Sequence, residues 1–312
     1  MNLLVSMRYL VALDEHKHFA RAAQACFVTQ PALSNAIRAL ETEFGAPIVK
    51  RGRSFAGFTA EGQRLLESAR RMLHEETLLK QDLDSASGQP QGQLIVGVVP
   101  SAEPLAARFA AMLHARHPGI APVLRSMSSP EIEAGLKELT LDLGLGFTER
   151  VRAGILRTLP QYTEHYYLVR RCEAPQDHGL RLAEPMSWQQ AAALPLCLMT
   201  PEMHNRGIVD GAFAQAGAVV KPVLETNSIL SLALSAMAGT VCSVMPGALV
   251  SAVRSFRELQ AHPLVGPEIQ TPMGFKVLVS QRMSRTLQAA LALAQDEAWL
   301  RHAAAHSGCL SA

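Results

Sequence analysis

The sequence predicts an N-terminal all-α winged helix-turn-helix with a linker helix, joined to a two-lobed α/β domain. Two alanine-rich helical segments separated by a short break lie within residues 21–41. A long amphipathic segment free of Gly and Pro follows at residues 63–86. From residue 93, short apolar runs alternate with helical segments. The chain of 312 residues is 48% hydrophobic, so it can form two or three domains with cores of their own.

The second of the two N-terminal helices is predicted to begin near Gln30. Thr29 is a favourable N-cap, and Pro31 lies in the first turn, where its missing N–H costs nothing. An apolar stripe that must pack inside the domain consists of Leu33, Ile37 and Leu40. The opposite face carries Pro31, Ser34, Asn35 and Arg38. Such a face suits a polar, negatively charged groove, and an ordinary helical hairpin in water is the alternative.

A short basic hairpin, or wing, is predicted directly after this helix pair. The net charge of +2 does not by itself indicate DNA binding, but "PIVKRGRSFAGFTAEG" places three cations around Gly52: Lys50, Arg51 and Arg53. Cations on a hairpin beside such a helix would lie on phosphates, which supplies affinity without sequence information. The predicted DNA contacts are Thr29, Gln30, Pro31, Ser34, Asn35, Arg38, Lys50, Arg51 and Arg53.

Residues 8–66 resemble the winged helix-turn-helix of the LysR-type transcriptional regulators. The positions that follow the family pattern with its spacing intact are Phe19, Ala22-Ala23, "TQPALS", Leu40-Glu41, Phe44-Gly45, Arg51 and Thr59-Ala60-Glu61-Gly62. Two positions depart from it: Cys26 replaces the usual leucine and Ile48-Val49 replaces Leu-Phe, and both changes are apolar. The resemblance implies a sequence-specific regulator that binds double-stranded promoter DNA, responds to a small-molecule effector and assembles as a homotetramer.

Residues 63–88 are predicted to form a linker helix that pairs with the same helix of a second copy. Apolar residues at alternating steps of four and three form a seam, interrupted by Glu76: Leu65, Ala69, Met72, Leu79 and Leu83. A helix packed within one chain is the alternative, and the resemblance favours pairing. The stretch "SGQPQG" then ends the helix. The predicted domains are residues 1–62, 63–88 and 92–312.

Residues 92–312 are predicted to form two α/β lobes, residues 92–161 with 266–312, and residues 162–265. The predicted strands are "LIVGVV", "APVLRSM", "DLGLGF", "YYLVRR", "PLCLM", "KPVLE", "TVCSVMP" and "GFKVLVS". The predicted helices lie at 103–117, near Glu131, and at 205–216, 229–238 and 286–304. Because strands and helices alternate, we expect parallel, doubly wound sheets. The resemblance implies an effector domain similar to periplasmic solute-binding proteins, with the ligand between the lobes.

Hydroxyl side chains follow four predicted strands where helices begin: Ser101, Ser128, Ser129, Thr200, Thr226 and Ser228. In open α/β sheets ligands lie at these strand ends, where helix N-termini present unpaired N–H groups. Such hydroxyls suit a small anion, usually a carboxylate, although each is also a common helix N-cap. Further candidates for the same cleft are Phe147, Thr148, His204, Asn205 and, as a charge partner, Arg206.

Five cysteines are scattered along the chain without metal-ligand spacing: Cys26, Cys172, Cys197, Cys242 and Cys309. One branch of the resembled family detects peroxide with two cysteines nine residues apart, but here Arg206 lies nine residues after Cys197. Cys197 and Cys242 lie in apolar runs, where a thiol acts as a small hydrophobic group. A thiol-based, oxidant-sensing regulator is therefore the alternative to a regulator controlled by a bound effector.

Motifs of enzymes and metal sites are absent from the sequence. It contains no P-loop, GxSxG, HExxH or GxGxxG motif, and its eleven histidines show no metal-ligand spacing. We therefore expect no catalysis, cofactor or metal, and a small-molecule-binding protein or an enzyme without a DNA role is the remaining alternative. The first residues lack the basic start of a signal peptide, and no apolar run approaches about 18 residues. We expect a cytoplasmic protein without membrane contact.

Overall fold

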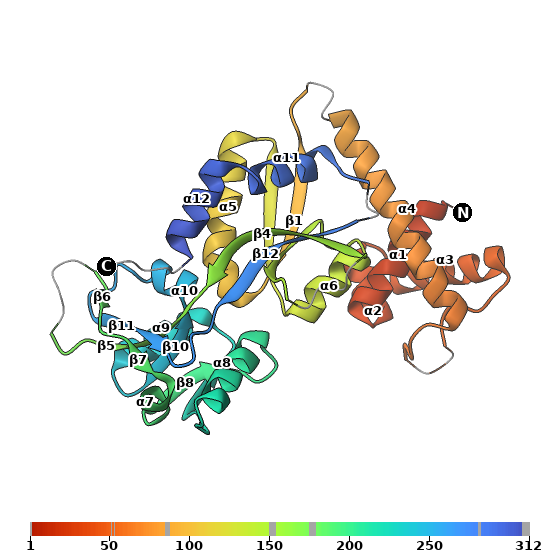
Figure 1. The fold of residues 1–312 in the computed structure, drawn as a ribbon. Helices are drawn as coiled ribbons and strands as arrows, with labels where there is room; N and C mark the ends of the chain where they lie inside the picture. The colour runs from red at the N-terminus through yellow and green to blue at the C-terminus, as the bar shows by residue number, and fades with distance from the viewer. Residues whose placement is uncertain are drawn as a thin grey trace. The chain divides into compact units, whose positions relative to one another are not determined.

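The computed structural model describes residues 2–50, 52, 54–84, 88–149, 154–174, 179–279 and 282–307 (Figure 1). The chain divides into two compact units, Met1–Ser87 and Gly88–Ala312. The first contains the helix-turn-helix and the second contains two sheets covered by helices. The predicted fold class is confirmed.

The first unit contains the helices α1 (Leu3–His16), α2 (Phe19–Ala25), α3 (Gln30–Phe44) and α4 (Ala60–Asp84). Thr29 caps α3, since its Oγ1 accepts a hydrogen bond from the N–H of Ala32 at 3.4 Å. Gly45 ends the same helix with a φ of 64°. The core of the unit joins α1, α2, α3 and α4 through Met7, Leu10, Leu13, Ala22, Ala23, Leu33, Ile37, Leu40, Leu66 and Ala69.

The wing connects α3 to α4. Val49 and Phe58 form an antiparallel bridge, and the N–H of Lys50 donates to the carbonyl oxygen of Gly57 at 2.9 Å. Gly62 lets α4 lie against the base of the wing, because a Cβ at this position would be 2.1 Å from the carbonyl oxygen of Ile48. Two of the predicted phosphate contacts in the wing lie outside the described residues: Arg51 and Arg53.

Helix α4 is held on α1 by two ion pairs. Arg70 donates to Asp14 at 2.7 Å, and Arg8 donates to Glu76 at 2.6 Å. Lys80 also pairs with Glu76, at 2.9 Å. The acid that interrupts the predicted seam is therefore bound within its own unit.

The predicted seam of α4 is only partly exposed. Ala69 is fully buried in the core of its own unit, so its assignment to an intermolecular seam is wrong. Met72, Leu79 and Leu83 are 44%, 55% and 66% exposed. These three residues form an apolar row along the outside of the helix.

The first sheet of the second unit has the strand order β2-β1-β3-β12-β4. Its strands are β1 (Gly92–Val98), β2 (Ile120–Ser126), β3 (Leu143–Phe147), β4 (Leu156–Glu164) and β12 (Thr271–Leu278). Its helices are α5 (Glu103–Arg116), α6 (Ser129–Lys137), α11 (Arg285–Ala294) and α12 (Glu297–His306). Phe109 of α5 packs on Phe275 and Trp299 with ring centroids 4.5 and 5.0 Å apart, so α5, β12 and α12 share one core.

The second sheet has the strand order β6-β11-β5-β10-β8-β9, and β7 pairs with β11. Its strands are β5 (Tyr166–Arg171), β6 (Arg181–Leu182), β7 (Met186–Ser187), β8 (Leu196–Met199), β9 (Leu224–Thr226), β10 (Cys242–Pro246) and β11 (Leu259–Val265). Its helices are α7 (Trp188–Ala192), α8 (His204–Gln215), α9 (Ile229–Ala238) and α10 (Gly247–Ala252). The chain passes between the two sheets twice, from β4 to β5 and from β11 to β12 (Figure 1).

The structure differs from the sequence prediction in three respects. Both sheets are mixed, because β12 runs antiparallel to β3 and β4, and β5 runs antiparallel to β10 and β11. The strands β4, β6, β7 and β11 and the helices α7 and α10 are absent from the sequence prediction. The predicted helix 286–304 is two helices, since the carboxylate of Asp296 caps α12 by accepting from the N–H groups of Ala298 and Trp299 at 3.0 and 3.1 Å.

Candidate functional site

The exposed face of α3 is the candidate nucleic-acid interface. Its outward side chains are exposed or half-buried: the polar Gln30, Ser34, Asn35 and Arg38, and the apolar Pro31. The apolar stripe on the other side is at most 3% exposed. Gln30 Nε2 donates to Ser34 Oγ at 3.0 Å, and Arg38 Nη1 donates to Asn35 Oδ1 at 3.5 Å. This face can offer donors and acceptors to the edges of bases, and exposed Lys50 extends it with a cation on the wing.

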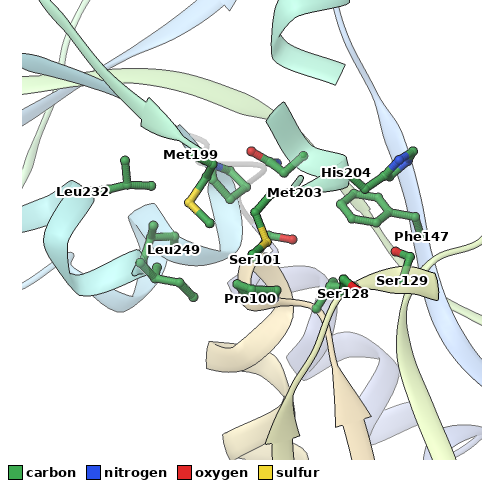
Figure 2. Close-up of a pocket in the computed structure, with 14 residues that line it drawn as sticks. Pro100, Ser101, Ser128, Ser129, Phe147, Met199, Met203, His204, Leu232 and Leu249 are labelled. Carbon is green, nitrogen blue, oxygen red and sulfur yellow. The ribbon is translucent and has the colours of Figure 1, made fainter. Parts of the chain in front are cut away.

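A pocket lies between the two lobes of the second unit, at the ends of β1, β3, β8 and β10. It encloses about 400 Å³ of space outside atoms, including the part open to solvent. Figure 2 shows an apolar side formed by Met199, Met203, Leu232 and Leu249. The first lobe contributes Pro100, Ser101, Ser128 and Ser129 (Figure 2).

Two serine hydroxyls in this pocket are buried without a hydrogen-bond partner among the described residues. Ser101 lies in the 3-10 turn η2 (Pro100–Ala102) that follows β1, and Ser129 begins α6. A buried polar group left unpaired costs about 1–3 kcal/mol. Both hydroxyls can therefore gain a hydrogen bond when a polar group enters the pocket.

Ser128 lines the same pocket, but its hydroxyl is occupied. Its Oγ and its N–H donate to the Glu131 carboxylate at 2.7 and 2.8 Å. These hydrogen bonds hold the pKa of the Glu131 carboxyl below its usual value. Ser128 therefore fixes the start of α6, which positions the neighbouring Ser129.

The three predicted threonines do not line the pocket, and their hydroxyls have other partners. Thr148 donates to the carbonyl oxygen of Pro272 at 3.2 Å. Thr200 donates to Glu202 at 2.7 Å, and Thr226 Oγ1 accepts from the N–H of Ser228 at 3.1 Å.

The sequence suggested Arg206 as the charge partner of a ligand, but in the structure its guanidinium is paired within the second lobe. It is 8% exposed and donates to Asp210 at 2.8 Å, to Glu225 at 2.6 Å and to the carbonyl oxygen of Met199 at 2.7 Å. The guanidinium therefore joins α8, β8 and β9 within the second lobe.

The remaining polar candidates, His204 and Asn205, line the pocket together with Phe147. The rings of Phe147 and His204 meet edge to face with centroids 4.6 Å apart. Asn205 donates to the hydroxyl of Tyr166 at 3.4 Å. Two side chains of α8 thus contact the end of β3 and the start of β5.

Sequence reasoning missed the apolar side of the pocket: Met199, Met203, Ile229, Leu232 and Leu249. Apolar residues at strand ends and helix starts give the same sequence signal as core residues, so the pattern could not separate them. None of the lining residues in the described part of the chain is Lys or Arg. This composition favours a ligand with an apolar body and one polar end.

The cysteines of the adjacent strands β8 and β10 face opposite sides of their sheet. Cys197 of β8 lies beside Ser243 of β10, the neighbour of Cys242. Successive side chains of a strand point to opposite faces, so the two thiols enter different cores. Burial raises the pKa of both thiols, which disfavours the reactive thiolate.

Within the described residues, no group of three or more His, Cys, Asp or Glu side chains could hold a metal ion. In the same part of the chain, none of the helices has the length and apolar character required to cross a bilayer.

A helix-turn-helix joined to a two-lobed effector-binding domain defines a DNA-binding transcriptional regulator. Residues 4–63 match the family described as bacterial regulatory helix-turn-helix protein, lysR family. Residues 87–299 match the LysR substrate binding domain. The chain belongs to the LysR family of transcriptional regulators.

The chain is similar to other transcriptional regulators over most of its own length and of theirs. The hydrogen peroxide-inducible genes activator of Pectobacterium carotovorum is 30% identical over 264 residues, which are 84% of this chain and 85% of that protein. The DNA-binding transcriptional dual regulator OxyR of Escherichia coli is 28% identical over 86% of this chain and 87% of its own. The relatives are regulators, which points away from an enzyme.

Two solved structures share the fold at 21% sequence identity. A full-length OxyR variant from Pseudomonas aeruginosa superposes with a TM-score of 0.66, covering 93% of this chain and 96% of its own. CbnR complexed with its target DNA gives a TM-score of 0.66 and covers 96% of this chain and 99% of its own.

Proposed function

We propose that this regulator reads double-stranded promoter DNA with the exposed face of α3 and anchors on phosphates through the wing. Thr29, Gln30, Pro31, Ser34, Asn35 and Arg38 form the base-reading side, and Lys50, Arg51 and Arg53 are the phosphate contacts. The amphipathic character of α3 supports the proposal, because the helix exposes its hydrogen-bonding side chains and buries its aliphatic stripe.

We further propose that the pocket between the lobes binds an effector with an apolar body and an oxygen-bearing end, such as a carboxylate. The observation that carries this proposal is the pair of unpartnered hydroxyls, Ser101 and Ser129, in a pocket whose apolar lining includes Met199 and Leu232. Ser129 is the first residue of α6 and lines the pocket. The N-terminus of this helix therefore lies at the pocket, where it favours negative charge.

A thermal-shift comparison on the full-length protein tests the effector proposal. Hexanoate combines an apolar body with a carboxylate, hexanol keeps the body with a hydroxyl, and sulfate is an anion without a body. We expect hexanoate and hexanol to raise Tm and sulfate to leave it unchanged. A ligand at 100 times its Kd adds about 2.7 kcal/mol to the free energy of unfolding. A rise with sulfate alone would contradict an apolar effector.

Assembly through α4 follows from its exposed apolar row. We propose that Met72, Leu79 and Leu83 of one chain pack on the same residues of a second chain, which would bring two helix-turn-helix units to one operator. A homotetramer, implied by the family resemblance, would then be a pair of such dimers.

Response to an oxidant is a second candidate function, favoured by the names of the relatives described as hydrogen peroxide-inducible genes activators. Peroxide treatment of purified protein, followed by operator binding with and without a reductant, separates the two candidates. We expect operator binding to be unchanged by peroxide and to respond to an effector. If peroxide changes operator binding when no effector is present, and a reductant reverses that change, thiol sensing would be favoured.

A further inference from the structure

Phe27 is an exposed aromatic residue in the turn between α2 and α3, and its backbone is left-handed. Its side chain is 95% exposed, and its φ is 56°. L-residues with a side chain rarely adopt this conformation, and Gly or Asn is the usual choice. The turn therefore places a bulky apolar side chain where the backbone disfavours it and where no core receives it.

The backbone of this turn has a clear structural role that the ring does not share. The N–H of Phe27 donates to the carbonyl oxygen of Gln24 at 3.1 Å, and the N–H of Val28 donates to that of Ala23 at 3.0 Å. This pair of hydrogen bonds is the Schellman ending of a helix, which requires a left-handed residue at position 27 whatever its side chain. Val28 turns inward and packs on the core, so Phe27 is directed outward.

The ring lies next to the part of the surface that we propose to bind DNA. Phe27 precedes Thr29, the N-cap of α3, by two residues. The following exposed residues, Gln30 and Pro31, begin the polar face of α3. When the N-terminal residues of a recognition helix contact base edges in the major groove, the preceding turn comes to the rim of the groove, where the sugar–phosphate backbone runs.

We propose that Phe27 packs its ring on the deoxyribose of the DNA backbone at the rim of the major groove. The inference rests on the proposed DNA-binding face of α3. The contact removes apolar surface of the ring and the sugar from water, so it adds affinity. It reads no base, and it releases no counterion because the ring carries no charge. This combination distinguishes Phe27 from Arg38, which would read bases, and from Lys50, which would neutralise a phosphate.

The test compares full-length Phe27→Asn with the parent protein on an operator duplex and on a scrambled duplex. Asn adopts the left-handed conformation readily, so we expect the Tm of the free protein to be equal or higher. We expect affinity for both duplexes to fall by the same factor, about tenfold, with an unchanged slope of log affinity against log salt. Phe44→Ala, at the other end of α3 and 47% exposed in the parent, is the matched control and should leave both affinities unchanged.

The outcomes separate this inference from the function on which it rests. A loss confined to the operator would overturn the sugar contact in favour of base reading. Unchanged DNA affinity would also overturn it, and lost transcription activation in that case would assign Phe27 to a protein partner. If Arg38→Ala weakens operator binding while Phe27→Asn does not, only the inference about Phe27 is wrong. If neither substitution has an effect, the proposed DNA-binding face itself is wrong.

Discussion

A carboxyl oxygen of Glu164 accepts a hydrogen bond from the N–H of Ala248 at 2.9 Å, which joins the last residue of β4 to α10. Glu164 is fully buried, and the hydroxyl of Tyr162 donates to its other oxygen at 3.3 Å. The residue after Glu164 is His165, where the chain crosses from the first sheet to the second. A buried carboxyl group therefore links the two lobes at one of their two crossings.

The stability of the protein should depend on pH through this group. Burial raises the pKa of Glu164 to about 8, so the folded protein keeps a proton that the unfolded chain releases above about pH 4.5. Its contribution to stability is fully present below that pH and is lost as the pH rises through about 8. Glu164→Gln should flatten the pH dependence of the free energy of unfolding between pH 5 and 8 by a few kcal/mol.

Urea unfolding at intervals across that range measures the effect. Glu43→Gln, an exposed substitution on α3, is the control and should keep the pH dependence of the parent. Equal pH dependence in Glu164→Gln and the parent would show that the buried carboxyl group does not control it.

The local parts of this fold could be predicted from the sequence because their signals are local. Thr29 and Pro31 mark the start of α3 by cap chemistry, and the spacing of Leu33 and Ile37 shows its buried face. The role of Glu164 could not be predicted, because its burial depends on α10, more than 80 residues later. Strand β4 escapes prediction for a similar reason: "LRTLPQYTE" has mixed polarity and becomes a strand through its pairing with β12.

The same distinction applies to the pocket: some of its features follow from local sequence and others depend on contacts between distant residues. Ser101 and Ser129 could be predicted because a hydroxyl at a strand–helix junction is visible in the sequence. Their lack of a partner among the described residues, and the ties of Thr148 and Arg206 to distant residues, depend on tertiary contacts.

Arg38→Ala and Lys50→Ala should weaken DNA binding in different ways. Arg38 lies on the exposed face of α3, so its loss should cost about 1–3 kcal/mol on the operator and relax discrimination between sequences. Lys50 lies in the wing, so its loss should weaken all sequences alike and reduce the salt slope by about one. Mobility shifts on operator and scrambled duplexes at several salt concentrations measure both effects. If Arg38→Ala retained full selectivity, the proposed orientation of α3 would be incorrect.

Leu79→Glu should break the assembly of the protein. Leu79 is 55% exposed in the single chain, and the proposed seam would bury it, so a carboxylate there should weaken pairing by several kcal/mol. Sedimentation velocity should show a smaller species than the parent. Thr77→Glu adds the same charge at an exposed position on the opposite side of α4 and should not change the oligomer. An unchanged oligomer in Leu79→Glu would mean that this row faces solvent.

Cys197 and Cys242 should not form a disulfide in the folded protein. Their strands are adjacent, but their side chains enter the cores on opposite faces of the sheet. Peptide mapping without reductant after peroxide treatment measures the bond directly. The same treatment in urea is the control, since the unfolded chain has no sheet to separate the thiols. A Cys197–Cys242 bond in the folded sample would require rearrangement of β8 and β10 and would revive the oxidant-sensing alternative.

Ser101→Ala should affect effector binding and folding in opposite directions. The substitution removes about one hydrogen bond to a charged end of the effector, roughly 1.5–3 kcal/mol or ten- to a hundredfold in affinity. It also removes a buried hydroxyl that has no partner among the described residues, so the Tm of the free protein should stay equal or rise. Calorimetry with hexanoate and thermal unfolding of the same variant measure the two effects.

Ser187→Ala removes the cap of α7, so this control should lower Tm and leave effector affinity unchanged. Unchanged affinity in Ser101→Ala would place the polar end of the effector elsewhere in the pocket.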